Sequence, residues 1–147
     1  MYKHILIPTD GSALSKKAVR EGIKFARSLG AKITFFHSQA EYEVVLYGEF
    51  VPPNLMTQGE FEAHATGNAE KILAAAAKAA AAAGVVAKTA HRASREPWEA
   101  IVAAARASKC DLIFMASHGR RGLAGLLLGS ETAKVLTHTK IPVLVYR

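Results

Sequence analysis

Short apolar segments alternate with long helical segments along the chain, and this alternation constrains the fold more than any other feature. Residues 3–9 form an apolar run that ends in a Pro-Thr-Asp-Gly turn, and apolar residues spaced three and four apart follow from Ser12 to Gly30. Ser12 is a suitable helix N-cap, and Gly30 is a suitable helix terminator. The sequence therefore opens with a strand, a turn and a helix.

The same order recurs along the rest of the chain. Further strands are predicted over 31–38, 85–91, 110–116 and 141–146, with a long loop over 39–57 and helices over 60–83, 97–107 and 129–137. This pattern predicts an α/β fold: a single doubly wound domain spanning residues 1–147, with a five-stranded parallel sheet and helices on both faces. In such sheets, ligands bind beyond the carboxyl ends of the strands, where the strand order reverses.

Composition narrows the class of protein. The length of 147 residues suits one domain, and a hydrophobic content of 50% excludes a disordered chain. The apolar N-terminal run is broken at Pro8 and Asp10, so we expect no export signal and no membrane span. Cys110 is the only cysteine, which excludes an internal disulfide and a CxxC pair. These features predict a soluble protein of the reducing cytoplasm.

Charge is unevenly distributed. The formal net charge is +7, yet residues 39–70 contain six glutamates and no lysine or arginine. The rest of the chain therefore carries all of the lysines and arginines, and this excess of positive charge favours an anionic ligand. Nucleic acid is a poor candidate, because the basic residues are dispersed and lack interleaved aromatic residues. The histidines show neither HxxxH nor HExxH spacing, and no nucleophile–histidine–acid arrangement is evident, so we predict no metal site and no catalytic residues.

A glycine-rich segment, residues 117–130, precedes the last predicted helix. Exposed N–H groups at a helix start bind anions, and glycines allow phosphate oxygens to approach the backbone. The segment contains no GxxxxGK[ST] loop, and no GxGxxG follows the first strand, so neither common nucleotide motif is present. Two interpretations remain from the residues alone: a phosphate-binding loop, or a flexible surface loop before an ordinary helix.

Three segments together resemble the universal stress protein family: ILIPTDGS at 5–12, MASHGRRGLAGLLLGSETAKVL at 115–136, and the ending IPVLVYR. The resemblance implies a five-stranded parallel sheet and dimerisation. In the nucleotide-binding branch of the family it further implies ATP in the crevice at the strand ends, held by the pattern G-2x-G-9x-G-[ST]. The second glycine of that pattern falls on Gly119 and the final pair on Gly129-Ser130, whereas Ala116 replaces the first glycine.

The resemblance implies a nucleotide site for ATP, ADP or AMP, with or without Mg²⁺. Its residues are Pro8, Thr9, Asp10, Ser38, Met115, Ala116, His118, Gly119, Arg120, Arg121, Gly129, Ser130, Glu131 and Thr132. Asp10 is expected to accept a hydrogen bond from the adenine amino group, His118 to contact phosphate or ribose, and the arginines to neutralise phosphate. The alternatives are a turn aspartate, a loop histidine, solvated arginines, and a glutamate that complements the helix dipole.

The resulting functional hypothesis is an adenine-nucleotide-binding universal stress protein that acts as a sensor or regulator in the stress response, with at most slow ATP hydrolysis. The alternative is a nucleotide-free dimeric stress protein that acts through protein partners, and Ala116 is the feature that favours it. In both cases the protein is expected to form a homodimer through its C-terminal strand, because the unpaired backbone groups of an edge strand can pair with a second copy.

Overall fold

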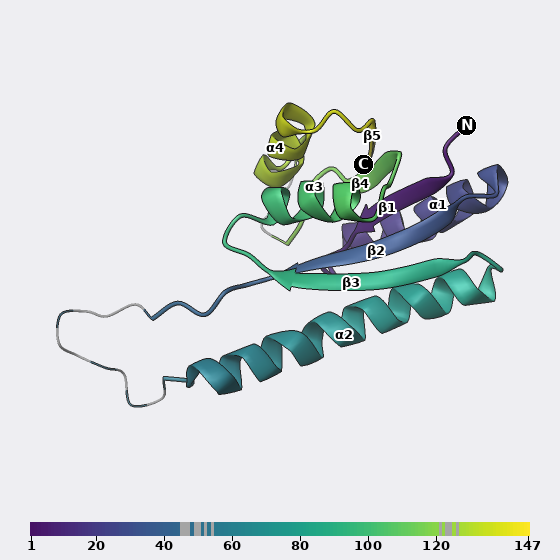
Figure 1. Cartoon of the computed structure of the whole chain (residues 1–147). Coiled ribbons are helices and arrows are strands. Elements are labelled where there is room, and N and C mark those ends of the chain that lie inside the picture. The colour runs from purple at the N-terminus through teal and green to yellow at the C-terminus, as the bar shows by residue number, and fades with distance from the viewer. Residues whose placement is uncertain are drawn as a thin grey trace.

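The computed structural model describes residues 1–44, 48, 51, 53, 55–120, 122, 125 and 127–147. Strands and helices alternate along it in the predicted order (Figure 1). The elements are β1 (His4–Pro8), α1 (Ala13–Leu29), β2 (Lys32–Gln39), α2 (Gln58–Ala82), β3 (Ala87–Ala93), α3 (Pro97–Ala107), β4 (Leu112–Ala116), α4 (Ser130–His138) and β5 (Val143–Tyr146).

All five strands are parallel and form one sheet in the order β3-β2-β1-β4-β5. The chain moves from β1 outward through β2 to β3, and then returns to the other side of β1 for β4 and β5. The strand order therefore reverses between β1 and β4. The predicted fold class is confirmed, and the reversal point fixes where the carboxyl ends of β1 and β4 open a crevice.

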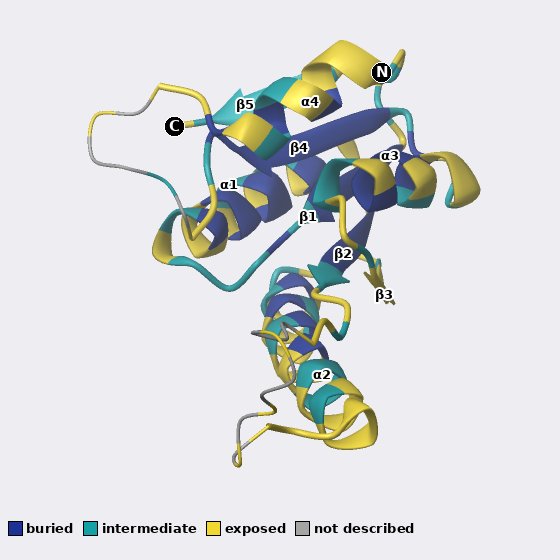
Figure 2. Ribbon diagram, turned by 90° about the vertical axis from the view of Figure 1, so that its left-hand side faces the viewer, coloured by how far each residue is buried: buried dark blue, intermediate teal, exposed yellow. Residues whose placement is uncertain are grey.

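Two hydrophobic cores lie on opposite faces of the sheet. Ile5 and Ile7 of β1 join the core that α1 and α2 cover, whereas Leu6 joins the core beneath α3 and α4. This alternation follows from the two-residue period of a strand, and it explains why a strand buried on both faces is apolar throughout. The central strands are accordingly buried along their length, while the outer faces of the helices are exposed (Figure 2).

The helix starts follow their capping residues. Ser12 accepts a hydrogen bond from the Ser15 N–H at 3.3 Å, and α1 ends at Gly30 with φ of 65°, as predicted. Helix α2 begins two residues earlier than the predicted 60, because Thr57 and Glu60 form a capping box. Backbone and hydroxyl hydrogen bonds from Thr57 lower the pKa of the Glu60 carboxyl.

Three strands begin two residues later than predicted, at Ala87, Leu112 and Val143. The residues that precede the first two of these strands still belong to helix ends: the Val85 N–H donates to Ala80 O and the Cys110 N–H donates to Ala105 O, both at 2.9 Å. Val85 and Cys110 therefore close the C-terminal turns of α2 and α3. Their apolar character reflects packing at the helix ends and does not mark the start of a strand.

Helix α2 is the longest element, with 25 residues. It buries Ala69, Leu73, Ala76 and Ala80, and this face packs on β2 and β3. The alanines on this face allow the helix to lie close to the sheet, and Figure 1 shows α2 alongside β3 with the opposite chain direction. Within the part of the chain that the structure describes, no helix combines the length and the apolar character that crossing a membrane requires.

Candidate functional site

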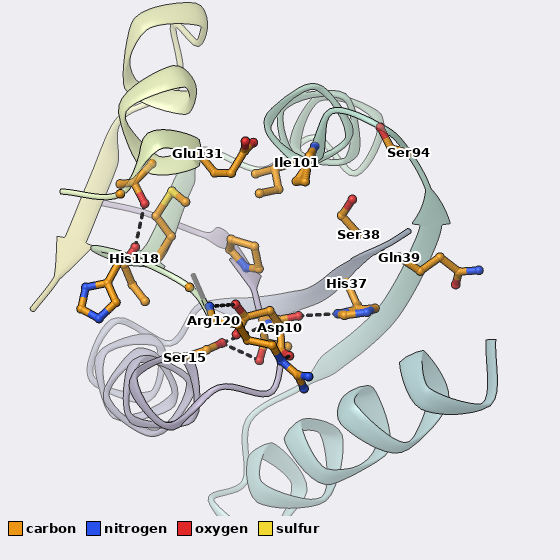
Figure 3. Close-up of a pocket in the computed structure, with 18 of the residues that line it drawn as sticks. Asp10, Ser15, His37, Ser38, Gln39, Ser94, Ile101, His118, Arg120 and Glu131 are labelled. Atoms are coloured by element: carbon orange, nitrogen blue, oxygen red, sulfur yellow. Dashed lines mark hydrogen bonds between the residues drawn. The ribbon is translucent and has the colours of Figure 1, made fainter. Parts of the chain in front are cut away.

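A cavity of about 1050 Å³ opens at the carboxyl edge of the sheet, at the reversal between β1 and β4 (Figure 3). With one exception, every residue predicted from the sequence lines it: Pro8, Thr9, Asp10, Ser38, Met115, Ala116, His118, Gly119, Arg120, Gly129, Ser130, Glu131 and Thr132. The exception, Arg121, lies outside the residues that the structure describes. The fold thus brings together segments that are more than 100 residues apart in the chain.

Asp10 joins the turn after β1 to the loop after β4. One carboxylate oxygen accepts the Ser12 N–H at 2.9 Å, and the other accepts the Arg120 N–H at 3.0 Å. A second hydrogen bond joins the same two residues, since Arg120 Nε donates to the Asp10 carbonyl at 2.9 Å. Both carboxylate oxygens are therefore already engaged by the backbone, and Asp10 fixes the relative position of two walls of the cavity (Figure 3).

Thr9 is held by three neighbours. Its N–H donates to Phe36 O at 2.8 Å, its hydroxyl accepts from the Ser15 hydroxyl at 2.7 Å, and its carbonyl lies 2.8 Å from Nδ1 of His37. A carbonyl only accepts, so His37 Nδ1 carries the proton, and in the neutral ring Nε2 is left as an acceptor. His37 is buried and lines the cavity, yet the sequence analysis did not select it.

Ser38 carries a buried hydroxyl without a partner. Its Oγ has no hydrogen bond within the described residues, and Ser38 lines the cavity (Figure 3). Leaving a buried polar group unpaired costs about 1–3 kcal/mol. A ligand that hydrogen-bonds this hydroxyl would recover that cost, so Ser38 is a candidate contact for a polar group of a ligand.

Ala116 ends β4 in an ordinary strand conformation. It pairs with Tyr146 of β5, and its carbonyl accepts the Thr132 hydroxyl at 3.0 Å. No positive φ is found at this residue, so nothing in the backbone requires glycine there. The departure from the glycine pattern is therefore accommodated by the fold, where Ala116 belongs to the hydrophobic core beneath α1 and α2 and also borders the cavity.

The two glycines that match the pattern lie where other groups approach closely. A Cβ on Gly119 would collide with the Asp10 carboxylate, and a Cβ on Gly129 would lie 3.0 Å from His118 Cα. The Gly129 N–H also donates to Ser117 O at 2.6 Å, which closes the base of the loop. The two glycines are therefore required for the close packing of the loop, whether or not a ligand also contacts them.

Glu131 connects the two helices that cover one face of the sheet. Its Oε2 accepts the Trp98 N–H at 2.9 Å, in the first turn of α3. That side chain therefore complements the positive end of α3, a neighbouring helix. The sequence indicated a role for Glu131 only toward its own helix, because the linear order does not show that α4 packs against α3.

The loop after β3 supplies a wall that the sequence analysis missed. Ser94, Arg95 and Pro97 line the cavity, and Arg95 Nε lies 3.0 Å from a carboxylate oxygen of Glu41. The sequence did contain a signal for this wall, since the loop leaves the carboxyl end of a predicted parallel strand and must open at the same edge of the sheet.

Among the described residues, no group of three His, Cys, Asp or Glu side chains could hold a metal ion.

Cys110 lies away from this cavity and is buried at the end of α3. Burial, with a smaller contribution from the Asp111 carboxylate, raises the pKa of the thiol to about 11. A thiol in that state is almost entirely protonated near neutral pH and is a poor nucleophile. Cys110 therefore acts as a small apolar packing residue beneath α3.

Comparison with known proteins identifies the family. Residues 1–147 match the Universal stress protein family. The chain belongs to this family. It is 33% identical over 147 residues to the "Universal stress protein in QAH/OAS sulfhydrylase 3'region" of Thermus aquaticus, and the match covers 100% of both chains. The family resemblance found in the sequence is confirmed.

Solved structures agree with this universal stress protein over almost its full length. The structure of the hypothetical protein MJ0577 superposes with a TM-score of 0.82 at 30% identity, covering 99% of this chain and 95% of that one. A universal stress protein in complex with cAMP superposes with a TM-score of 0.70 at 26% identity, covering 99% and 97%. The second relative is thus described with a bound adenine nucleotide.

Proposed function

We propose that this universal stress protein binds an adenine nucleotide in the cavity at the carboxyl edge of its sheet. The observation that carries the proposal is the convergence of the predicted residues on one cavity at the strand-order reversal. The related protein in complex with cAMP supports the choice of ligand. A cavity of about 1050 Å³ also provides room for a mononucleotide, since ligand sites commonly enclose roughly 300–1,000 Å³.

The chemistry of the walls suggests an orientation for the nucleotide. The ends of β1 and β2 present polar groups that suit a base, in particular the free Ser38 hydroxyl. The opposite wall is formed by Gly119, Arg120 and the start of α4, where backbone N–H groups and a guanidinium suit phosphate. We therefore propose that the base lies toward β2 and the phosphates toward α4.

ATP is the finer proposal, with ADP and AMP as alternatives. If Mg²⁺ accompanies ATP, the phosphate oxygens and water would supply most of its ligands, as is common for this ion. Binding without efficient catalysis fits the site best. Rapid phosphoryl transfer needs a metal held in place and a group that positions the attacking nucleophile. The described residues offer no metal cluster, and Asp10 already accepts two backbone hydrogen bonds.

We propose a sensor or regulator of the stress response as the cellular role, and the cytoplasm as its compartment. Nucleotide phosphates would add contacts to the loop after β4, which Asp10 and Gly129 already tie to the sheet. A ligand that binds one arrangement of this loop more tightly shifts the population toward it. The loop surface would then report whether the site is filled.

A nucleotide-free dimer that acts through protein partners is the second candidate, and the edge position of β5 favours a dimer in either case. β5 pairs only with β4 among the described strands, and its four residues are half-buried in the single chain. Its outer backbone groups are therefore available to a second copy. We propose that β5 mediates homodimerisation.

The decisive experiment identifies the ligand directly. Freshly purified protein is denatured, any released nucleotide is identified by chromatography, and refolded or stripped protein is titrated calorimetrically with AMP, ADP and ATP, with and without Mg²⁺. Stoichiometric adenine nucleotide or saturable one-to-one binding is expected. Folded protein that releases no nucleotide and gives no heat with any of the three would overturn the proposal and favour the nucleotide-free dimer.

A further inference from the structure

A second cavity, of about 500 Å³, lies between α1 and α2 on the face of the sheet opposite α3. Its floor is apolar and is formed by Val19, Ile72 and three alanines of α2. Its rim is basic: Lys16 and Arg20 are one turn apart on α1, Lys71 faces them from α2, and Arg120 closes one end. We call this space the α1–α2 cleft.

The charge of the cleft is uncompensated within the described residues. No aspartate or glutamate lines it, and Lys16, Arg20 and Lys71 form no salt bridge with a described residue. The first turn of α1 contains no acidic residue either. Several like charges around one concave space repel one another and attract a polyanion.

The cleft adjoins the nucleotide cavity. Thr9, Asn68 and Arg120 line both spaces. The Arg120 guanidinium extends over the turn after β1, since its Nη2 lies 3.2 Å from the position of a Cβ on Gly11. Ile72 Cδ1 approaches the same point at 3.0 Å. Arg120 therefore forms part of the partition between the two cavities, and its backbone is held there by Asp10.

We propose that the α1–α2 cleft is a second binding site, for a chain of two or more phosphate groups. The rim supplies N–H donors on several sides, and an oligophosphate has acceptors along its whole length. The enclosed volume suits a small ligand and not a protein segment. The site does not rest on nucleotide binding in the larger cavity, because Lys16, Arg20 and Lys71 do not line that cavity.

The phosphate chain could come from a free oligophosphate or from a nucleotide whose base occupies the adjoining cavity. Both sources share the same chemistry in the cleft. The two sources differ in how AMP and ATP affect the binding of a free oligophosphate. If the cleft takes a free oligophosphate, this ligand would bind beside either AMP or ATP. If the cleft takes the phosphate tail of ATP that reaches past Arg120, ATP would block the cleft and AMP would leave it open.

The test uses inorganic tripolyphosphate as the probe, titrated calorimetrically into the full chain at low and moderate salt, alone and with saturating AMP or ATP. Saturable one-to-one binding that survives AMP and weakens with salt is expected. The triple variant Lys16→Gln, Arg20→Gln, Lys71→Gln should lose about 10- to 100-fold in affinity, from three exposed charge contacts. Its affinity for AMP should stay within about twofold, because these side chains lie outside the nucleotide cavity.

A matched control removes three cations elsewhere: Lys24→Gln, Lys78→Gln and Lys109→Gln lie outside the cleft and lower the net charge equally. This control should retain tripolyphosphate binding. Equal losses in both variants would show a general charge effect and overturn the site, as would absence of binding, full competition by AMP, or equally tight binding of citrate. Since AMP binding is measured separately, failure of the cleft and failure of the nucleotide site are distinguished.

Discussion

Ser38 combines two properties in one side chain. Its hydroxyl is buried without a partner in the described structure, and it lines the proposed nucleotide site. The same atom should therefore weaken the empty protein and strengthen its complex. An unpaired buried hydroxyl is a cost before binding, whereas a hydrogen bond to the ligand is a gain after binding.

We predict opposite effects of Ser38→Ala on stability and on affinity. The free energy of unfolding of the empty protein should rise by about 1 kcal/mol, because the unpaired hydroxyl is removed. Affinity for AMP should fall about 2- to 12-fold, which corresponds to one hydrogen bond. Urea unfolding and calorimetry measure the two effects, with the exposed Ser28→Ala as the control. Unchanged affinity would show that this hydroxyl does not contact the ligand.

Asp10 supports the site by holding its walls together. Its two carboxylate oxygens accept from the N–H groups of Ser12 and Arg120. Asp10→Asn keeps one acceptor oxygen and replaces the other with a donor, so only one of these contacts survives. We predict a loss of about 1 kcal/mol in unfolding free energy and faster amide exchange at Arg120.

Hydrogen exchange followed by mass spectrometry measures this second effect on peptides that contain residue 120. Glu21→Gln is the matched control, because it also neutralises an acid but faces only the exposed Lys24. If Asp10→Asn leaves exchange at Arg120 unchanged, the carboxylate does not hold the loop, and a role toward the ligand becomes the better explanation for Asp10.

At the scale of elements, the alternation of apolar and helical periods was enough to predict the sheet, its helices and the edge where the site lies. The contacts that shape the site were not predictable in the same way. His37 meets Thr9, and Glu131 meets Trp98, only because parallel strands and neighbouring helices bring distant residues together. Linear spacing encodes which face a residue occupies, but not which side chain lies opposite it.

The glycines of α2 and its terminus separate two physical effects. Gly67 lies inside the helix and Gly84 follows it with φ of 71°, and a Cβ at either position would meet no atom within 4 Å. Packing is therefore equal at the two positions. Only the backbone differs, since a helical glycine costs conformational entropy and a left-handed glycine avoids steric strain.

We predict that Gly67→Ala raises the unfolding free energy by about 0.5–1 kcal/mol, and that Gly84→Ala lowers it by about 1–2 kcal/mol. Urea unfolding of both variants measures the difference. The AMP affinity of both should equal that of the original chain, because neither residue lines the proposed nucleotide cavity. Changes of the same sign would mean that Gly84 does not adopt the left-handed conformation that follows α2.

At the scale of the whole molecule, the proposed ligand site and the groups expected to make stability depend on pH lie at opposite edges of the sheet. The cavity opens at the carboxyl ends of the strands, whereas His4 begins β1 and Asp111 precedes β4 at the amino ends. The Asp111 carboxylate accepts the backbone N–H groups of Lys3 at 2.8 Å and His4 at 3.0 Å. His4 Nε2 lies 2.8 Å from the Thr34 hydroxyl, in a buried position.

Both groups have lowered pKa values in the folded protein. Burial, with the nearby Lys32 charge, lowers the pKa of His4 below 6.5. For Asp111, burial alone would raise the pKa, but the hydrogen bonds from Lys3 and His4 outweigh it and the pKa lies below 3.8. In each case the unfolded chain binds a proton more readily than the folded chain, so stability falls as the pH decreases.

We therefore predict two acid-dependent losses of stability. The first begins as pH falls below about 6.5 and ends at the folded pKa of His4; the second begins below about 3.9 and ends at the folded pKa of Asp111. Urea unfolding at about pH 8, 5.5 and 3 measures both. His4→Gln should flatten the first loss and Asp111→Asn the second. An unchanged pH dependence in His4→Gln would assign the first loss to another group, while Asp111→Asn tests the second loss independently.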